Sequence, residues 1–113
     1  GFEAGSGLEA GWGIEAGQGI EAGRGIEAGE GIEAGSGIEA GWGIEAGEGI
    51  EAGSGIKAGL SISAKFVFAR LRIFAGLCLW RIPSPEEMQI RAEVRSGTVS
   101  HGVLVAPLAG VAE

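Results

Sequence analysis

The sequence predicts an all-β protein: a parallel β-solenoid of six-residue repeats over residues 1–60, followed by a β-hairpin C-terminal cap over residues 61–113. Ten consecutive hexads follow the pattern Gly-Ile-Glu-Ala-Gly-X, and variation is concentrated at the sixth position. Glycine supplies 24 of the 113 residues and proline only 3, and the alternating four-two spacing of the glycines excludes collagen. After residue 60 glycine becomes rare, and alternating apolar and polar residues indicate ordinary strands.

The six-residue period excludes an α-helix. Successive isoleucines would point about 240° apart on a helix and would scatter over three faces. Each glycine inside a helix also costs roughly 1 kcal/mol relative to alanine. A single flat strand fits no better, because one of its faces would carry only glycine and glutamate and would have nothing to pack.

A solenoid gives every position of the hexad a role. Each Ile-Glu-Ala triplet forms a short strand whose isoleucine and alanine point inward and whose glutamate points outward. Each Gly-X-Gly forms a corner, where we expect glycine to supply positive φ angles and X to project outward. One hexad cannot bury its isoleucine, so the unit is stable only as an array. A triangular coil of three hexads is favoured, and a flat coil of two hexads stays open.

Residues 61–113 are expected to form strands at 61–74, 77–82, 88–95 and 98–105, and a loose tail at 106–113. Pro83, Ser84 and Pro85 predict a turn, and Ser96-Gly97 predicts a tight hairpin. We expect this cap to cover one end of the solenoid, because open strand edges promote edge-to-edge association. No cap is visible at the first hexad, so we expect that a cap or further repeats have been lost there or that another chain covers that end.

Over residues 1–60 the pattern resembles the hexapeptide-repeat parallel β-helices. It is also similar to uncharacterised bacterial and phage-borne proteins with Gly-Ile-Glu-Ala-type repeats. The resemblance implies a parallel β-helix fold. It does not extend to the hexapeptide acyltransferases, which place a small residue four positions after the aliphatic one, where this chain has Trp12, Gln18, Arg24 or Trp42.

No motif predicts catalysis, a cofactor or a metal, and we expect a protein that is not an enzyme. Each repeat matches the glycine spacing of a dinucleotide-binding loop, but the strand and helix that such a loop needs on either side are missing. The chain has no aspartate, one cysteine and one histidine, and the spacing of Cys78 and His101 does not suggest a nucleophilic pair.

Evenly spaced glutamates are the main candidate for an interaction surface. In a three-hexad coil Glu3, Glu21 and Glu39 form a column that ends at Lys57. Such rows could keep a stacked sheet in solution, bind a partner or a cation, or imitate the phosphates of DNA. Two tryptophans at corner positions are further candidates. The predicted surface consists of Trp12, Trp42, Glu9, Glu15, Glu21, Glu27, Glu33, Glu39 and Glu45.

Charge is divided between the two regions. The net charge of −7 is the sum of −9 over residues 1–60 and +2 over residues 61–113. This polarity favours a homo-oligomer or a filament through the solenoid ends, or a protein partner, and the overall charge argues against direct nucleic-acid binding. The sequence has no run of 18 apolar residues and therefore predicts no membrane span. The leading hypothesis is a structural or interaction module, a rigid acidic β-solenoid rod that self-associates. The alternative is an acidic DNA-mimic inhibitor of a nucleic-acid-binding protein.

Overall fold

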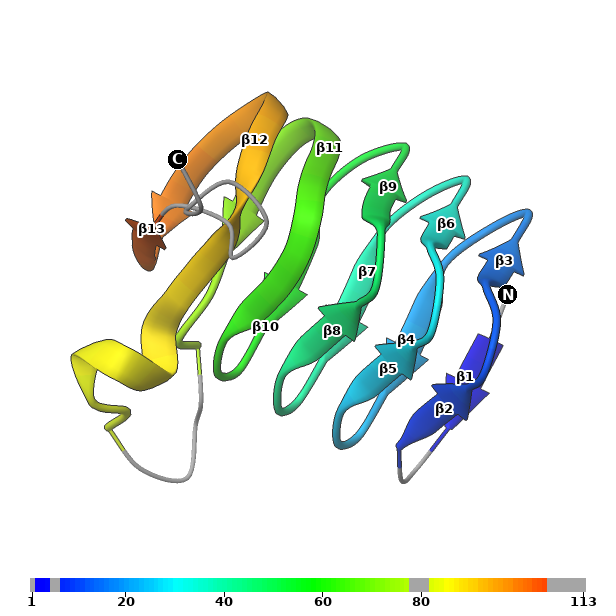
Figure 1. Cartoon of the computed structure of the whole chain (residues 1–113), viewed down its shortest axis with the longest axis horizontal. Helices are drawn as coiled ribbons and strands as arrows, with labels where there is room; N and C mark the ends of the chain where they lie inside the picture. Colours follow the sequence, from blue (N-terminus) through cyan, green and yellow to red (C-terminus); the bar gives the residue numbers. More distant parts are fainter. Residues whose placement is uncertain (1, 5–6, 78–81, 106–113) are drawn as a thin grey trace.

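A computed structural model describes residues 2–4, 7–77 and 82–105, and these form a parallel β-solenoid of about five coils (Figure 1). In the described residues nine strands of three residues and one of four follow the hexads, and two strands of 13 residues and a final strand of three come after them. The strands are β1 (Phe2–Ala4), β2 (Leu8–Ala10), β3 (Ile14–Ala16), β4 (Ile20–Ala22), β5 (Ile26–Ala28), β6 (Ile32–Ala34), β7 (Ile38–Ala40), β8 (Ile44–Ala46), β9 (Gly49–Ala52), β10 (Ile56–Ala58), β11 (Ile62–Phe74), β12 (Gln89–His101) and β13 (Val103–Val105).

Each repeat coil contains three hexads, which confirms the triangular cross-section. Strands 18 residues apart pair in parallel and in register, as Ile20 does with Ile38 and Glu21 with Glu39. We call the three sides of the prism the first face (β1, β4, β7, β10), the second face (β2, β5, β8) and the third face (β3, β6, β9). Residues at equivalent places in the hexad therefore form columns along the stack whenever their numbers differ by 18.

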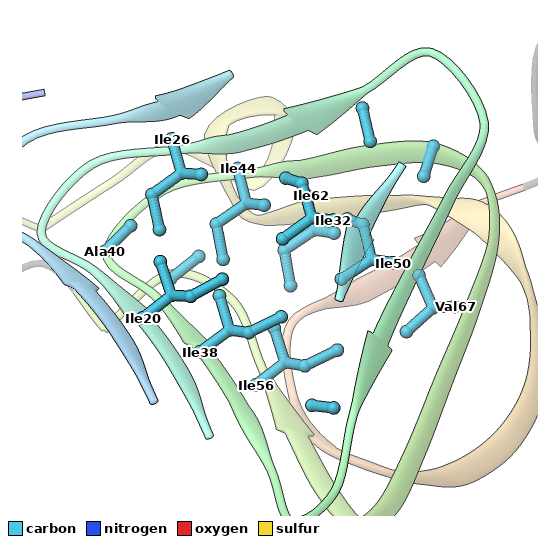
Figure 2. Close-up of a cluster of buried hydrophobic side chains, with 14 of the residues drawn as sticks. Ile20, Ile26, Ile32, Ile38, Ala40, Ile44, Ile50, Ile56, Ile62 and Val67 are labelled. Carbon is cyan, nitrogen blue, oxygen red and sulfur yellow. The ribbon is translucent and has the colours of Figure 1, made fainter. Parts of the chain in front are cut away.

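The interior of the prism is filled by the aliphatic side chains of the hexads. Ile20, Ile38 and Ile56 are each at most 1% exposed, and Figure 2 shows them in a row, beside the row from the second face. The alanine of each triplet is also buried from Ala22 onward, whereas the glutamate between them is exposed. The predicted inward and outward directions are therefore confirmed for the described hexads.

Backbone hydrogen bonds run along the stack at the corners as well as in the strands. At one corner the amide of Ser36 donates to the carbonyl of Gln18, and the amide of Ser54 donates to that of Ser36, both at 3.0 Å. The backbone of the sixth position is thus held by its neighbours in the stack while its side chain points away. This arrangement explains why Trp, Gln, Arg, Glu and Ser can all occupy that place.

The corner glycines are required for a different reason from the one expected. Among the described residues positive φ angles occur only at Gly76, Gly97 and Gly102, so the prediction of positive φ at the repeat corners is wrong. Space is what excludes a side chain at the fifth position. A Cβ at Gly29 would overlap the carbonyl oxygen of Gly11 in the coil below, and would lie 2.9 Å from its carbonyl carbon. Glycine at this position lets adjacent coils approach closely.

The C-terminal region continues the solenoid, so the predicted β-hairpin is wrong. Strand β11 runs along all three faces in turn, pairing in parallel with β8, β9 and β10. Strand β12 pairs in parallel with β11 along most of its length, and β13 pairs in parallel with β12. Ser96 and Gly97 lie inside β12 and do not reverse the chain. The change at residue 60 therefore separates two sequence patterns along one continuous stack.

An aliphatic-X-Ala doublet explains why the stack continues after the glycines end. The pairs Ile62 and Ala64, Val67 and Ala69, Ile73 and Ala75, and Ile90 and Ala92 are all buried, and they extend the inner columns. Spacing between doublets falls from six residues to five at Val67, which pairs with Ile50 at an offset of 17. The register irregularities between β11 and β12 accommodate these unequal intervals.

Between β11 and β12 the chain leaves the coil. A 3-10 helix (Pro85–Met88) follows the predicted turn, and the Glu87 carboxylate accepts a hydrogen bond from the Ser84 amide at 3.0 Å. Most of the strand expected at 77–82 and the tail expected at 106–113 lie outside the described residues. The whole molecule measures 36 × 31 × 26 Å and is therefore a squat prism, whereas the sequence suggested a rod.

Candidate interaction surface

Each face of the prism carries one column of outward-pointing carboxylates. Glu21 and Glu39 lead to Lys57 on the first face, as predicted, and the backbone of Glu3 pairs with Glu21 below them. The second face carries Glu9, Glu27 and Glu45. The third face carries Glu15, Glu33 and Glu51. The predicted glutamates are thus divided among three directions and do not form one surface.

The carboxyl groups of one column interact with each other. Glu15 and Glu33 are in register on β3 and β6, and both are exposed. A hydrogen bond to Glu33 and the repulsion between the two charges raise the pKa of Glu15 above its ordinary value. The physical cause is the fixed spacing of the coils, which holds like charges at the distance between neighbouring strands.

The two predicted tryptophans lie on different corners. Their separation of 30 residues is not a multiple of 18, so they cannot share a column. Trp12 is 72% exposed and begins the column that continues with Glu30 and Glu48. Trp42 is 42% exposed, and the guanidinium of Arg24 stacks over its ring at 5.3 Å. The two tryptophans therefore face different directions, and a role of either one in a contact surface stays a prediction.

Half of the glutamates described in residues 7–60 gather along the corner before the third face and on that face itself. The corner contributes Glu30 and Glu48, which the sequence analysis did not include, because the coil size was still open. An 18-residue comparison of the sixth positions would have found them. A hollow of about 440 Å³ lies along this corner, lined by Trp12, Glu15, Glu30, Glu33, Glu48, Glu51 and Phe66 together with three glycines and Ile14.

Aromatic and basic side chains of β11 and β12 follow the glutamates along the stack, beyond the end of this acidic surface. Phe68 pairs in register with Glu51 and is 45% exposed, so it follows the glutamate column of the third face. Phe66 lies above Gly49, and the guanidinium of Arg95 stacks on its ring at 4.1 Å. Exposed aromatic rings beside charged groups are typical of protein contact surfaces.

The residues considered for catalysis or metal binding are not brought together in the described part of the chain. No group of three His, Cys, Asp or Glu side chains there is arranged to hold a metal ion. His101 donates from Nδ1 to the Ala75 carbonyl at 2.6 Å, which ties the end of β12 to the end of β11. Cys78 lies outside the described residues. No helix in the described ranges is long and apolar enough to cross a membrane.

Comparisons with known proteins assign no family. No protein-family model matches the chain, and neither the curated proteins nor the solved structures contain a match.

Proposed function

We propose that this protein is a protein-interaction module that self-associates, with the solenoid as a rigid frame for charged sheet faces. The observation that supports it is the division of charge along the stack. Residues 7–54 carry ten glutamates and one arginine, whereas the described residues from 55 to 105 carry six basic and three acidic side chains. Two copies packed side by side in opposite directions would bring unlike charges together.

The rigidity of the frame favours this role over an enzymatic one. Backbone bonds between coils and a continuous aliphatic interior hold each outward side chain at a fixed place. Association then requires little ordering of the backbone, which lowers its entropic cost. We also propose kinship with the hexapeptide-repeat β-solenoids and with the bacterial and phage Gly-Ile-Glu-Ala repeat proteins, which the 18-residue coil supports.

Sedimentation equilibrium over a range of concentrations tests the proposal. At low salt we expect the weight-average mass to rise above the 11.3 kDa of one chain as concentration increases. The increase should be smaller at about 1 M salt, where the Debye length falls to about 3 Å. A strictly monomeric protein at every concentration and both salt levels would reject self-association.

A DNA mimic is the second candidate, and charge density favours it. The second coil, residues 19–36, carries four glutamates and one arginine, a net charge of −3. With coils about 4.8 Å apart, this is one charge for about every 1.6 Å of stack, close to the roughly 1.7 Å of double-stranded DNA. Competition with duplex DNA for a generic DNA-binding protein tests it, and absence of displacement at low salt would reject it.

A further inference from the structure

The exposed side chains of the third face and of its leading corner change from acidic to mainly basic and aromatic between the third and fourth coils. Below this level lie four carboxylates from the second and third coils, Glu30, Glu33, Glu48 and Glu51. Above it lie exposed Lys65, Phe68 and Arg70 on β11 and, on β12, exposed Arg95, whose guanidinium donates to the Glu93 carboxylate at 3.0 Å. The third face with its leading corner therefore carries an acidic half and a mainly basic and aromatic half, and the two meet at a line across the strands.

The two halves are aligned residue by residue. The Lys65 amide donates to the Glu48 carbonyl at 2.7 Å, so Lys65 stands directly above Glu48 at the corner. Phe68 stands above Glu51 on the face. Arg95 belongs to the fifth coil and stacks on Phe66 of the fourth. Glu48 and Glu51, the two acidic residues next to the boundary, thus each have a counterpart at the same lateral position in the half above them.

We infer that a second copy of this chain docks on the third face, related by a two-fold axis that runs parallel to the strands between the third and fourth coils. This inference rests on the proposed self-association and names its surface. Such an axis reverses the direction of the stack and keeps each lateral position. Glu48 then faces Lys65 of the second copy, Glu51 faces Phe68, and Glu33 faces the strand position next to Arg95. Every contact occurs twice.

The other two faces offer less to a second copy. On the first face Glu21 and Glu39 have one basic residue in their column, Lys57. On the second face Glu27 and Glu45 have Arg91, above Ser63. Neither column includes an exposed aromatic ring comparable to Phe68, which is 45% exposed at the centre of the third face. The corner before the second face does hold Trp42, which is 42% exposed, so it is charge complementarity that favours the third face.

The expected dimer is weak. Four overlapping coils give a contact about 19 Å tall, and a three-residue strand with its corners is roughly 15 Å wide, so about 300 Å² is covered on each copy. A standard interface covers about 800 Å² per partner, so this contact belongs with small, transient interfaces. Much of its attraction is electrostatic, and we expect the dissociation constant to rise at least tenfold between about 0.02 M and about 1 M salt.

Charge reversal with a matched control tests the surface. Glu48→Lys with Glu51→Lys should weaken the dimer at least about tenfold, because both repeats of the contact become repulsive. Glu27→Lys with Glu45→Lys makes the same change in net charge on the second face and should weaken it far less. Circular dichroism and thermal unfolding of both variants verify that the solenoid is intact. Equal weakening by the two pairs would reject the third face as the docking surface.

A second double variant with the complementary charge reversal tests whether dimerisation can be restored, and not only whether it is lost. Lys65→Glu with Arg70→Glu should also be monomeric alone, because each reversed site faces the native glutamates of its partner. Mixing this variant with Glu48→Lys/Glu51→Lys should restore dimers, since both contacts of the mixed dimer pair unlike charges. No recovery on mixing, while the unmodified protein dimerises, would overturn the assigned surface and leave self-association standing. An unmodified protein that never dimerises would overturn both.

Discussion

Glu15 lies directly beside Glu33 on the neighbouring coil, with both carboxyl groups exposed on the third face and the two residues in register. A shared hydrogen bond and charge repulsion raise the pKa of Glu15 in the folded protein. An unfolded chain releases the two groups from this fixed spacing. The folded state therefore holds its proton to a higher pH than the unfolded state does.

We predict that acid stabilises this pair of coils. With the folded pKa of Glu15 above its unfolded value, its contribution to stability is present below the unfolded pKa and is lost as pH rises through the folded pKa. The melting temperature should accordingly increase as pH falls from 7 toward the ordinary range of glutamate. Carboxyl-carbon NMR titration of Glu15 provides the direct measurement. A pKa at or below the ordinary glutamate value, or a melting temperature that falls steadily from pH 7 to 4, would contradict this prediction.

Removal of one charge should imitate the effect of acid. Glu33→Gln keeps the size and a hydrogen-bonding group beside Glu15 but removes the repulsion. We expect a higher melting temperature at pH 7 and a smaller change in melting temperature between pH 7 and 4. If the variant showed the same pH dependence as the unmodified protein, the interaction of these two carboxyl groups would not be its source.

Two glycines of one hexad should respond differently to alanine. A Cβ at Gly41, in the fifth position, would overlap the carbonyl oxygen of Gly23, whereas a Cβ at Gly37, in the first position, would lie 3.3 Å from the Gly55 oxygen. Neither glycine has a positive φ. Gly41→Ala should lower the free energy of unfolding by about 2 kcal/mol or more. Gly37→Ala should change it by less than about 1 kcal/mol, because the less flexible unfolded chain offsets the tight contact.

Urea unfolding of the two glycine variants measures this difference. The chain already has a residue with a side chain at one first position, because Ser61 lies beside Gly43 there. A Cβ built at Gly43 would lie 3.1 Å from the carbonyl oxygen of Ser61. Equal destabilisation by the two alanines would show that the glycines are needed for backbone conformation and not for the approach of the coils.

The inner column should be far more sensitive than the outer one. Ile38 is 1% exposed in the middle of the stack, so Ile38→Ala should lower the free energy of unfolding by about 2–5 kcal/mol. Glu39, the next residue, is exposed, and Glu39→Ala should change it by about 0.5 kcal/mol or less. Both values follow from chemical denaturation, and comparable effects of the two substitutions would contradict the assigned directions of the side chains.

The repeat region could be predicted from sequence because its pattern is redundant. Ten similar hexads fix which residue points inward, and the isoleucine columns follow from it. Coil size could not be decided, since the sixth positions have no period of their own. The consequence extended to the candidate surface: the corner column of Trp12, Glu30 and Glu48 is apparent only once residues 18 apart are known to be neighbours.

The C-terminal region was mispredicted because two cues changed together. Its corners contain almost no glycine, and its doublets are separated by five, six and seventeen residues, so Ile62-Ser63-Ala64 and Ile90-Arg91-Ala92 no longer read as repeats. Ser96-Gly97 has the composition of a hairpin turn. In the structure parallel pairing of Val94 with Val67 and Val99 with Ile73 on either side of this pair overrides that local preference.

Disulfide trapping tests the three-hexad coil most directly. With Cys78 replaced by serine, Glu33→Cys and Glu51→Cys place two thiols in register on adjacent strands of the third face, within reach of a disulfide. Glu33→Cys with Glu45→Cys, two hexads apart, places them on different faces. Mass spectrometry of the dilute, mildly oxidised protein should find an intramolecular disulfide in the first variant and free thiols in the second. The reverse result would contradict the triangular solenoid.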